Sequence, residues 1–112
     1  MAIGEIMETR ALFNKAEATL RAVTKEADSI LLALREAETA AETEHLRAKE
    51  ARDWDDKNTV LAAKHAYERY SAISLAARDV SGFLVGAQSA LHALNMKTCE
   101  WAVYAARNDI AA

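Results

Sequence analysis

Apolar residues recur at heptad spacing along the first half of the chain. A first row begins at Ile6 and continues through Phe13, Leu20, Ala27, Leu34, Ala41 and Ala48. A companion row, three residues further on, contains Ala16, Val23, Ile30, Ala37 and Ala51. Two rows at this spacing form one stripe on an α-helix. No Gly or Pro interrupts the stripe, which therefore predicts one helix over about residues 5–52.

The stripe ends in an acidic segment that is dense in turn-forming residues, Asp53-Trp54-Asp55-Asp56-Lys57-Asn58-Thr59. Asp and Asn are favoured helix N-caps, and acidic side chains suit the positive end of a helix dipole. The segment predicts a chain reversal over residues 53–58, with Asp56 or Asn58 capping the next helix.

A second heptad pattern extends from about residue 59 to residue 107. Its apolar positions are Ala62, Ala66, Ile73, Ala76, Val80, Phe83, Ala87, Ala90, Leu94, Trp101 and Tyr104. The segment 78–82, which contains Gly82, also allows a helix end followed by a new cap. One continuous helix and two helices with a break near 79–82 are therefore both open, and the unbroken heptad phase favours the first.

Composition supports an all-α fold. The 112 residues include 26 alanines, three glycines and no proline, so the chain lacks the usual punctuation of β-structure and is rich in helix formers. A chain of this length fits one domain, 1–112. The expected fold is a long antiparallel helical hairpin.

Charge is distributed unequally about the reversal. Residues 1–57 contain 22 charged side chains with a net charge of -4, whereas residues 58–112 contain nine with a net charge of +1. A charge-poor helix with a wide apolar face needs more cover than one partner helix supplies. We therefore expect self-association, most simply into a four-helix bundle of two hairpins, or binding to another helical protein. A three-helix monomer is the alternative.

The expected protein-binding face lies on the second helix, with the turn tryptophan as a further contact. Its residues are Val80, Phe83, Leu84, Ala87, Leu91, Leu94, Trp101, Tyr104 and Trp54. Gly82 and Gly86 lie four residues apart, which suits close helix packing.

The totals also bear on partners and location. A net charge of -3 argues against nucleic acid as a partner. The longest stretch without a charged residue, 80–96, is too short and too polar to predict a membrane span. The first residues lack a signal-peptide pattern, and the single Cys99 gives no sign of an oxidising compartment. We expect a cytoplasmic protein, with secretion by a route without a cleaved signal peptide still open.

No pattern of catalytic residues emerges. Glu42 and His45 have the Glu-x-x-His spacing of di-iron bundles, and the neighbouring Glu38 extends the acidic set, but the second helix lacks matching ligands. A solvated helix face is the simpler interpretation, and Cys99 is expected to be a buried structural thiol. We therefore predict no enzyme activity, no metal site and no cofactor.

A hairpin of about this length with Trp54 at its turn resembles, in architecture, the WXG family of type VII secretion substrates. The resemblance implies a secreted protein that forms dimeric four-helix bundles. The chain departs from both family motifs, because Asp56 stands where the family has Gly and Tyr104 is followed four residues later by Asn108.

Three functional hypotheses follow. The first is a non-enzymatic protein-interaction module, such as an adaptor, a small assembly subunit or an inhibitor. The second is a secreted hairpin of the WXG type. The third is a metal-binding bundle that uses Glu38, Glu42 and His45.

Overall fold

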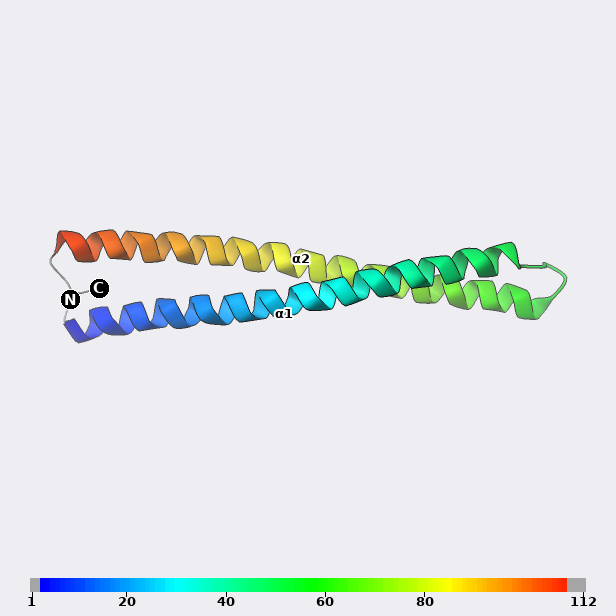
Figure 1. The fold of residues 1–112 in the computed structure, drawn as a ribbon, viewed down its shortest axis with the longest axis horizontal. Helices are drawn as coiled ribbons and strands as arrows, with labels where there is room; N and C mark the ends of the chain where they lie inside the picture. Colours follow the sequence, from blue (N-terminus) through cyan, green and yellow to red (C-terminus); the bar gives the residue numbers. More distant parts are fainter. Residues whose placement is uncertain (1–2, 109–112) are drawn as a thin grey trace. The chain divides into compact units, whose positions relative to one another are not determined.

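The computed structural model describes residues 3–108 and contains two α-helices joined by a turn (Figure 1). Helix α1 spans Ile3–Glu50 and helix α2 spans Lys57–Arg107. The predicted all-α hairpin is confirmed, and the helix starts and the first helix end lie two residues earlier than expected. Helix α2 continues through residues 79–82, so the alternative of a break there is wrong.

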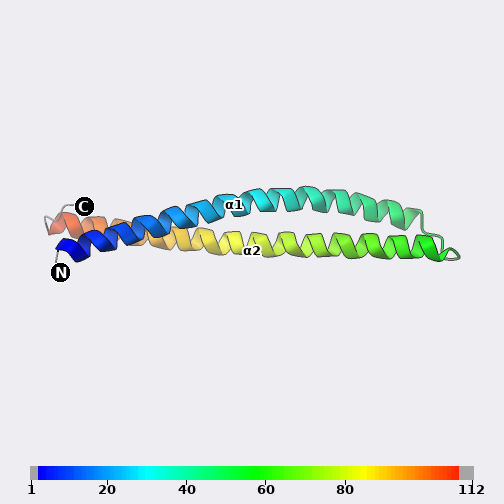
Figure 2. The ribbon, with the colours of Figure 1, turned by 90° about the horizontal axis from the view of Figure 1, so that it is seen from below.

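The chain divides into two compact units, and each unit contains a segment of both helices. Unit 1 comprises Met1–Glu26 and Leu84–Ala112, and unit 2 comprises Ala27–Phe83. Within unit 2 the two helical segments lie side by side and are antiparallel, both extending from the turn on the same side of it (Figures 1 and 2). In unit 1 the end of α2 runs antiparallel to the start of α1.

The turn is held by hydrogen bonds among Asp53, Asp56 and Thr59. The Thr59 hydroxyl lies 2.9 Å from the Asp53 carbonyl oxygen and 2.8 Å from that of Asp56, and it accepts the Asp53 N–H at 2.9 Å. The Asp56 carboxylate accepts the N–H of Asn58 at 3.0 Å. Asp56, and not Asn58, is therefore the N-cap of α2, because its side chain satisfies a free N–H of the first helical turn.

Replacing the cap tests this geometry. We expect Asp56→Ala to lower the free energy of unfolding by about 1 kcal/mol, because the Asn58 N–H then loses its acceptor. Urea denaturation monitored by circular dichroism measures the change. Asp55→Ala is the matched control, since the Asp55 side chain makes no contact of this kind in the turn. An equal loss in both variants would contradict the cap assignment.

The first heptad row of α1 packs against α2 as predicted, and we call it the inner row of α1. All of its members with described side chains are buried or half-buried: Phe13, Leu20, Ala27, Leu34, Ala41 and Ala48. The companion row, called here the outer row of α1, was wrong as an intrachain seam. Ala16, Val23, Ile30 and Ala51 are exposed, and only Ala37 is half-buried.

In place of the outer row, α1 turns a largely polar row toward α2. This row lies four residues beyond the inner row, continues past the end of α1 to Arg52, and is half-buried throughout: Glu17, Thr24, Leu31, Glu38, His45 and Arg52. Positions i+3 and i+4 flank a residue on opposite sides of the same helix face, so only one flank can lie against a single partner helix.

Helix α2 behaves in the same way. Its inner row was predicted and is buried or half-buried: Ala66, Ile73, Val80, Ala87, Leu94 and Trp101. The row that completes the seam is Ala63, Tyr70, Ala77, Leu84, Leu91, Thr98 and Ala105. The other predicted row is called here the outer row of α2 and includes Ala62, Ala76, Phe83, Ala90 and Tyr104. Each of its positions comes one residue before a position of the row that completes the seam, and Phe83 and Tyr104 are exposed.

The core enclosed by these rows is small. Among the described side chains the buried apolar residues are Ala27, Ala41, Ala63, Ala77, Leu84, Ala87 and Ala105, so Leu84 is the only one larger than alanine. Alanine seams bring two helices close together but bury little apolar area for each residue. The hairpin therefore leaves most of its large apolar side chains in contact with solvent.

Candidate protein-binding face

The structure separates the predicted binding residues into two groups. Leu84 and Ala87 are buried against α1, and Val80, Leu91, Leu94 and Trp101 are half-buried in the same seam. Phe83, Tyr104 and Trp54 remain outside, with 53%, 43% and 73% of their surface exposed. The seam residues are therefore occupied within the chain, and they cannot also form an outward face of the hairpin.

Exposed apolar residues on α1 were missed as site candidates. Val23 and Ile30 were expected inside the seam, yet they are 38% and 47% exposed. Both belong to the outer row of α1, as Phe83 and Tyr104 belong to the outer row of α2. The heptad pattern contained this information, but it does not say which flank of a wide apolar stripe the intrachain partner covers.

An ion pair shows that the two outer rows lie on one side of unit 2. The Glu44 carboxylate lies 3.0 Å from the Arg69 guanidinium across the helix pair. Glu44 is seven residues beyond Ala37 in the outer row of α1, and Arg69 is seven residues before Ala76 in the outer row of α2. Residues seven apart share a helix face. We call this surface the unit 2 face, composed of Ile30, Ala37, Glu44, Arg69, Ala76 and Phe83.

The opposite side of unit 2 is polar. The corresponding row of α1 consists of Asp28, Arg35, Glu42 and Lys49. Here the Arg35 guanidinium donates to the Glu38 carboxylate at 3.0 Å. The hydroxyl of Ser74 on α2 and, second, the guanidinium of Arg35 hold the pKa of Glu38 below its ordinary value. This side of unit 2 therefore carries a row of charged side chains, whereas the unit 2 face combines apolar residues with a single ion pair.

The lowered pKa of Glu38 gives a pH-dependence with a definite sign. A carboxyl group that is more acidic in the folded chain stabilises it above the unfolded pKa, and the contribution is lost as the pH falls through the folded pKa. We expect thermal stability to fall less between pH 6 and pH 3 in Ser74→Ala than in the parent chain. Ser71→Ala on the same helix is the control. Identical pH profiles for all three proteins would show that the Ser74 contact has no role.

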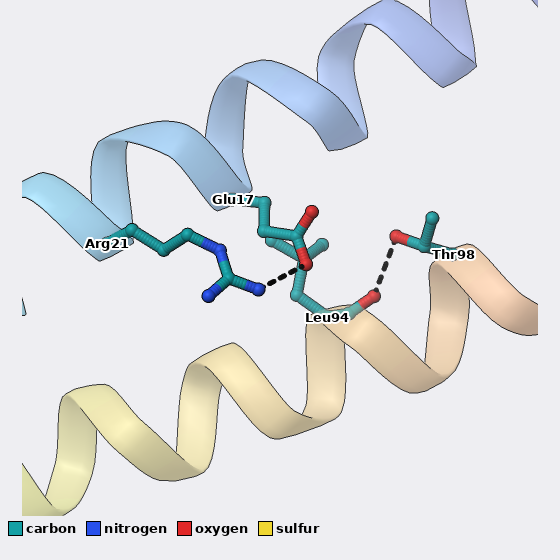
Figure 3. A network of polar contacts seen from close by, with 4 residues as sticks. All are labelled: Glu17, Arg21, Leu94 and Thr98. Atoms are coloured by element: carbon teal, nitrogen blue, oxygen red, sulfur yellow. Dashed lines mark hydrogen bonds and ion pairs between the residues drawn. The ribbon is translucent and has the colours of Figure 1, made fainter.

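Unit 1 also has a polar group between its helices. The Arg21 guanidinium lies 3.4 Å from the Glu17 carboxylate. Figure 3 shows this ion pair opposite Leu94 and Thr98 of α2. The Thr98 hydroxyl donates to the Leu94 carbonyl oxygen at 3.0 Å. Polar side chains thus occupy part of the seam between the two helical segments of unit 1.

The C-terminal aromatic residues of unit 1 form a partly exposed pair. The rings of Trp101 and Tyr104 lie 5.4 Å apart, and they line a shallow cavity with Phe13, Lys97 and Glu100. The Trp101 indole N–H is buried without a hydrogen-bond partner. Buried N–H groups are normally paired. The Nδ1 atom of His45 in unit 2 is also buried without a partner, so each unit has one such atom among its described side chains.

Trp54 extends from the turn and does not pack back onto the helices. The Arg52 guanidinium lies over the Trp54 ring, 4.1 Å from the ring centroid. A cation over an exposed indole is worth about 0.5–1 kcal/mol. This contact orders the ring and leaves most of its surface accessible.

The acidic residues considered for metal binding do not converge. His45 faces α2, where its ring lies 5.3 Å from that of Tyr67 and stacks on Tyr70 at 6.1 Å. The neighbouring hollow is lined by the cations Lys49, Arg52 and Lys64 and contains no carboxylate. Within residues 7–108 no three His, Cys, Asp or Glu side chains gather as metal ligands.

Cys99 and the two glycines of α2 lie outside the contacts that were expected of them. Cys99 is exposed, so its prediction as a buried thiol was wrong, because its position on α2 points away from the α1 seam. A Cβ atom placed on Gly82 or Gly86 would meet nothing within 4 Å. Neither glycine therefore serves close packing within the chain.

Comparisons with known proteins add no family. The chain matches no protein-family model, no curated protein and no solved structure. Across the part of the chain that the structure describes, neither helix is long and apolar enough to cross a membrane.

Proposed function

We propose that the chain is a non-enzymatic helical module that acts by binding other helical protein chains. The observation that supports this is the imbalance between core and surface. Among the described side chains, one residue larger than alanine is buried, whereas the large apolar residues with more than a third of their surface exposed include Ile30, Leu75, Phe83, Val85 and Met96. Large apolar side chains that remain in contact with water on a folded chain are typical of surfaces that bind other proteins.

The partner is either a second copy of the chain or a different helical protein, and adaptor, assembly-subunit and inhibitor roles all use such a surface. We propose a cytoplasmic location, because an exposed free thiol such as Cys99 suits a reducing compartment.

Sedimentation velocity over a range of concentrations, together with binding of an apolar fluorescent dye, tests the proposal. We expect either an assembly larger than the monomer, or a monomer that binds the dye and loses dye binding when its partner is added. A stable monomer that binds no dye would refute the proposal, because it would show that the apolar residues form no accessible surface.

A secreted hairpin of the WXG type is the second candidate, and the exposed Trp54 in the turn between two long helices favours it. Its test is cellular. We expect the intact chain, with its first residues uncleaved, in the culture medium of its host. Retention of all the protein inside the cells would exclude this candidate and leave the first untouched.

A further inference from the structure

Each helix carries a longer apolar stripe than the hairpin uses. The inner and outer rows of α1 together occupy twelve positions from Phe13 to Ala51, and Glu44 is the only charged residue among them. The matching rows of α2 from Ala62 to Tyr104 contain only Arg69 and Lys97 as charged residues. Such paired rows are the core positions of a four-helix bundle.

The hairpin alone buries only half of this stripe. The outer rows stay exposed except at the half-buried Ala37 and Ala76, and α1 places Glu17, Glu38 and His45 against α2 instead. Burying polar side chains while apolar neighbours face water is unfavourable for a two-helix protein. The arrangement makes sense when further helices cover the outer rows.

We propose that the unit 2 face is covered by the same face of a second copy, with the two turns side by side and the twofold axis parallel to the helices. The inference deepens the proposed function by naming the partner, and it rests on that function. In this arrangement each α1 lies next to its own α2 and to the partner's α2, and all neighbouring helices are antiparallel.

Side chains of matching size meet at each level when the unit 2 faces of two copies are brought together. Antiparallel helices place Ala37 level with Ala76, one heptad from the Glu44–Arg69 pair, and Ile30 level with Phe83, two heptads from it. The twofold axis places each layer of one chain at the same level as the identical layer of the second chain. Two Ile30 and two Phe83 side chains then form an apolar cluster, and four alanines form a close-packed layer beside it.

Charge complementarity identifies the partner as a second copy in this orientation. Glu44 and Arg69 are the only charged residues of the unit 2 face, and both are more than half exposed, with side-chain exposures of 58% and 66%. The axis places the Glu44 carboxylate between its own Arg69 and the partner's Arg69. Signs then alternate around the layer. A charged layer of this kind fixes register and orientation more than it adds stability.

The reverse orientation mismatches the layers of the unit 2 face. Its central layer is Ala37 with Ala76, so reversing the second copy about this layer sets the Glu44–Arg69 pair of each copy against Ile30 and Phe83 of the other. An ion pair would then lose water to apolar side chains without gaining a charged partner, which opposes association.

Mixing two charge-reversed chains tests the proposal. Glu44→Arg makes the whole layer positive, and Arg69→Glu makes it negative, so each variant alone is expected to raise the dimer dissociation constant by about 100-fold. An equimolar mixture is expected to form a one-to-one heterodimer with an affinity within about tenfold of the parent. An ion pair that acts only within one chain cannot be rescued by mixing.

Matched controls reverse charges elsewhere in unit 2. Glu42→Arg lies on the polar side of α1, and Arg78→Glu is an exposed residue of α2 outside the outer row. Neither change, alone or mixed, is expected to alter the sedimentation coefficient. Circular dichroism is used to check that all four variants remain helical, so that a loss of dimer reports on the interface.

A cysteine pair tests the orientation separately in a Cys99→Ser background. Ala37→Cys in one chain and Ala76→Cys in another are expected to form a mixed disulfide after joint refolding, because the turn-to-turn dimer places them in one layer. The reverse dimer would instead link two copies of Ala37→Cys, because reversal about the centre of the unit 2 face brings this layer onto itself. That second product, or a dimer that is insensitive to the charge reversals, would overturn the proposed interface but leave the interaction module intact.

The state of the parent chain separates the two proposals. A dye-binding monomer at high concentration would overturn the second-copy inference while still supporting a heterologous partner. A monomer without dye binding would overturn both.

Discussion

Replacing Phe83 by aspartate is expected to abolish association while leaving the helices intact. Phe83 is 53% exposed in the hairpin and makes the largest side chain of the unit 2 face. Burying a phenylalanine is worth about 1.5–3 kcal/mol, and a buried unpaired carboxylate costs several kcal/mol more. We expect Phe83→Asp to raise the dissociation constant of the assembly by at least about 1,000-fold, measured by sedimentation.

Leu75→Asp is the control for this prediction. Leu75 is also about half exposed, at 56%, and lies on the same helix, but on the side of α2 away from both α1 and the unit 2 face. We expect the control variant to keep the oligomeric state of the parent chain. Equal dissociation by both substitutions would show that association depends on general apolar surface and not on this face.

The second large effect is expected inside the hairpin. Ala77 has no exposed surface and lies in the seam of unit 2. An aspartate at this position would place a carboxylate between closely packed helices without a cation beside it. We expect Ala77→Asp to lower the free energy of unfolding by at least about 3 kcal/mol, which is a large fraction of the stability of a small domain.

Ala72→Asp separates this packing effect from helix propensity. Ala72 is exposed on the same helix, so its replacement costs only the difference in propensity, about 0.7 kcal/mol. Both variants are compared with the parent by urea denaturation at one protein concentration, because association contributes to stability. Similar losses for the two would indicate that Ala77 is not enclosed as the structure shows.

The heptad pattern predicted the elements well for a physical reason. An uninterrupted stripe of apolar residues without proline has one low-energy arrangement, an amphipathic helix, and the turn stands out because Asp53, Asp56 and Thr59 bond to backbone groups. The inner rows, such as Leu34 in α1 and Val80 in α2, were also identified correctly.

The candidate site was only partly predictable. Phe83 and Tyr104 were expected on a binding face and are exposed, whereas Leu84 and Ala87 were assigned to the same face and are buried. A helix with an apolar stripe three rows wide offers two ways to pack on one partner. Which of the two occurs depends on which flank of the other helix packs against it, and the local sequence of one helix does not encode this.

Contacts between distant residues were beyond sequence reasoning altogether. His45 was considered as a metal ligand, but its ring lies between Tyr67 and Tyr70. Glu44 and Arg69 were ordinary members of two charge patterns until the fold placed them 3.0 Å apart.

The amino-acid sequence by itself determined two long helices, the reversal between them, and an apolar stripe too wide for one helical partner. Periodicity and composition suffice for these features because they depend on residues within a few turns of one another. Only the tertiary structure decided which flank of each stripe is enclosed. That choice brings Ile30, Phe83 and the Glu44–Arg69 pair to one side of unit 2, since it depends on how two helices, paired across the turn, fit their side chains together.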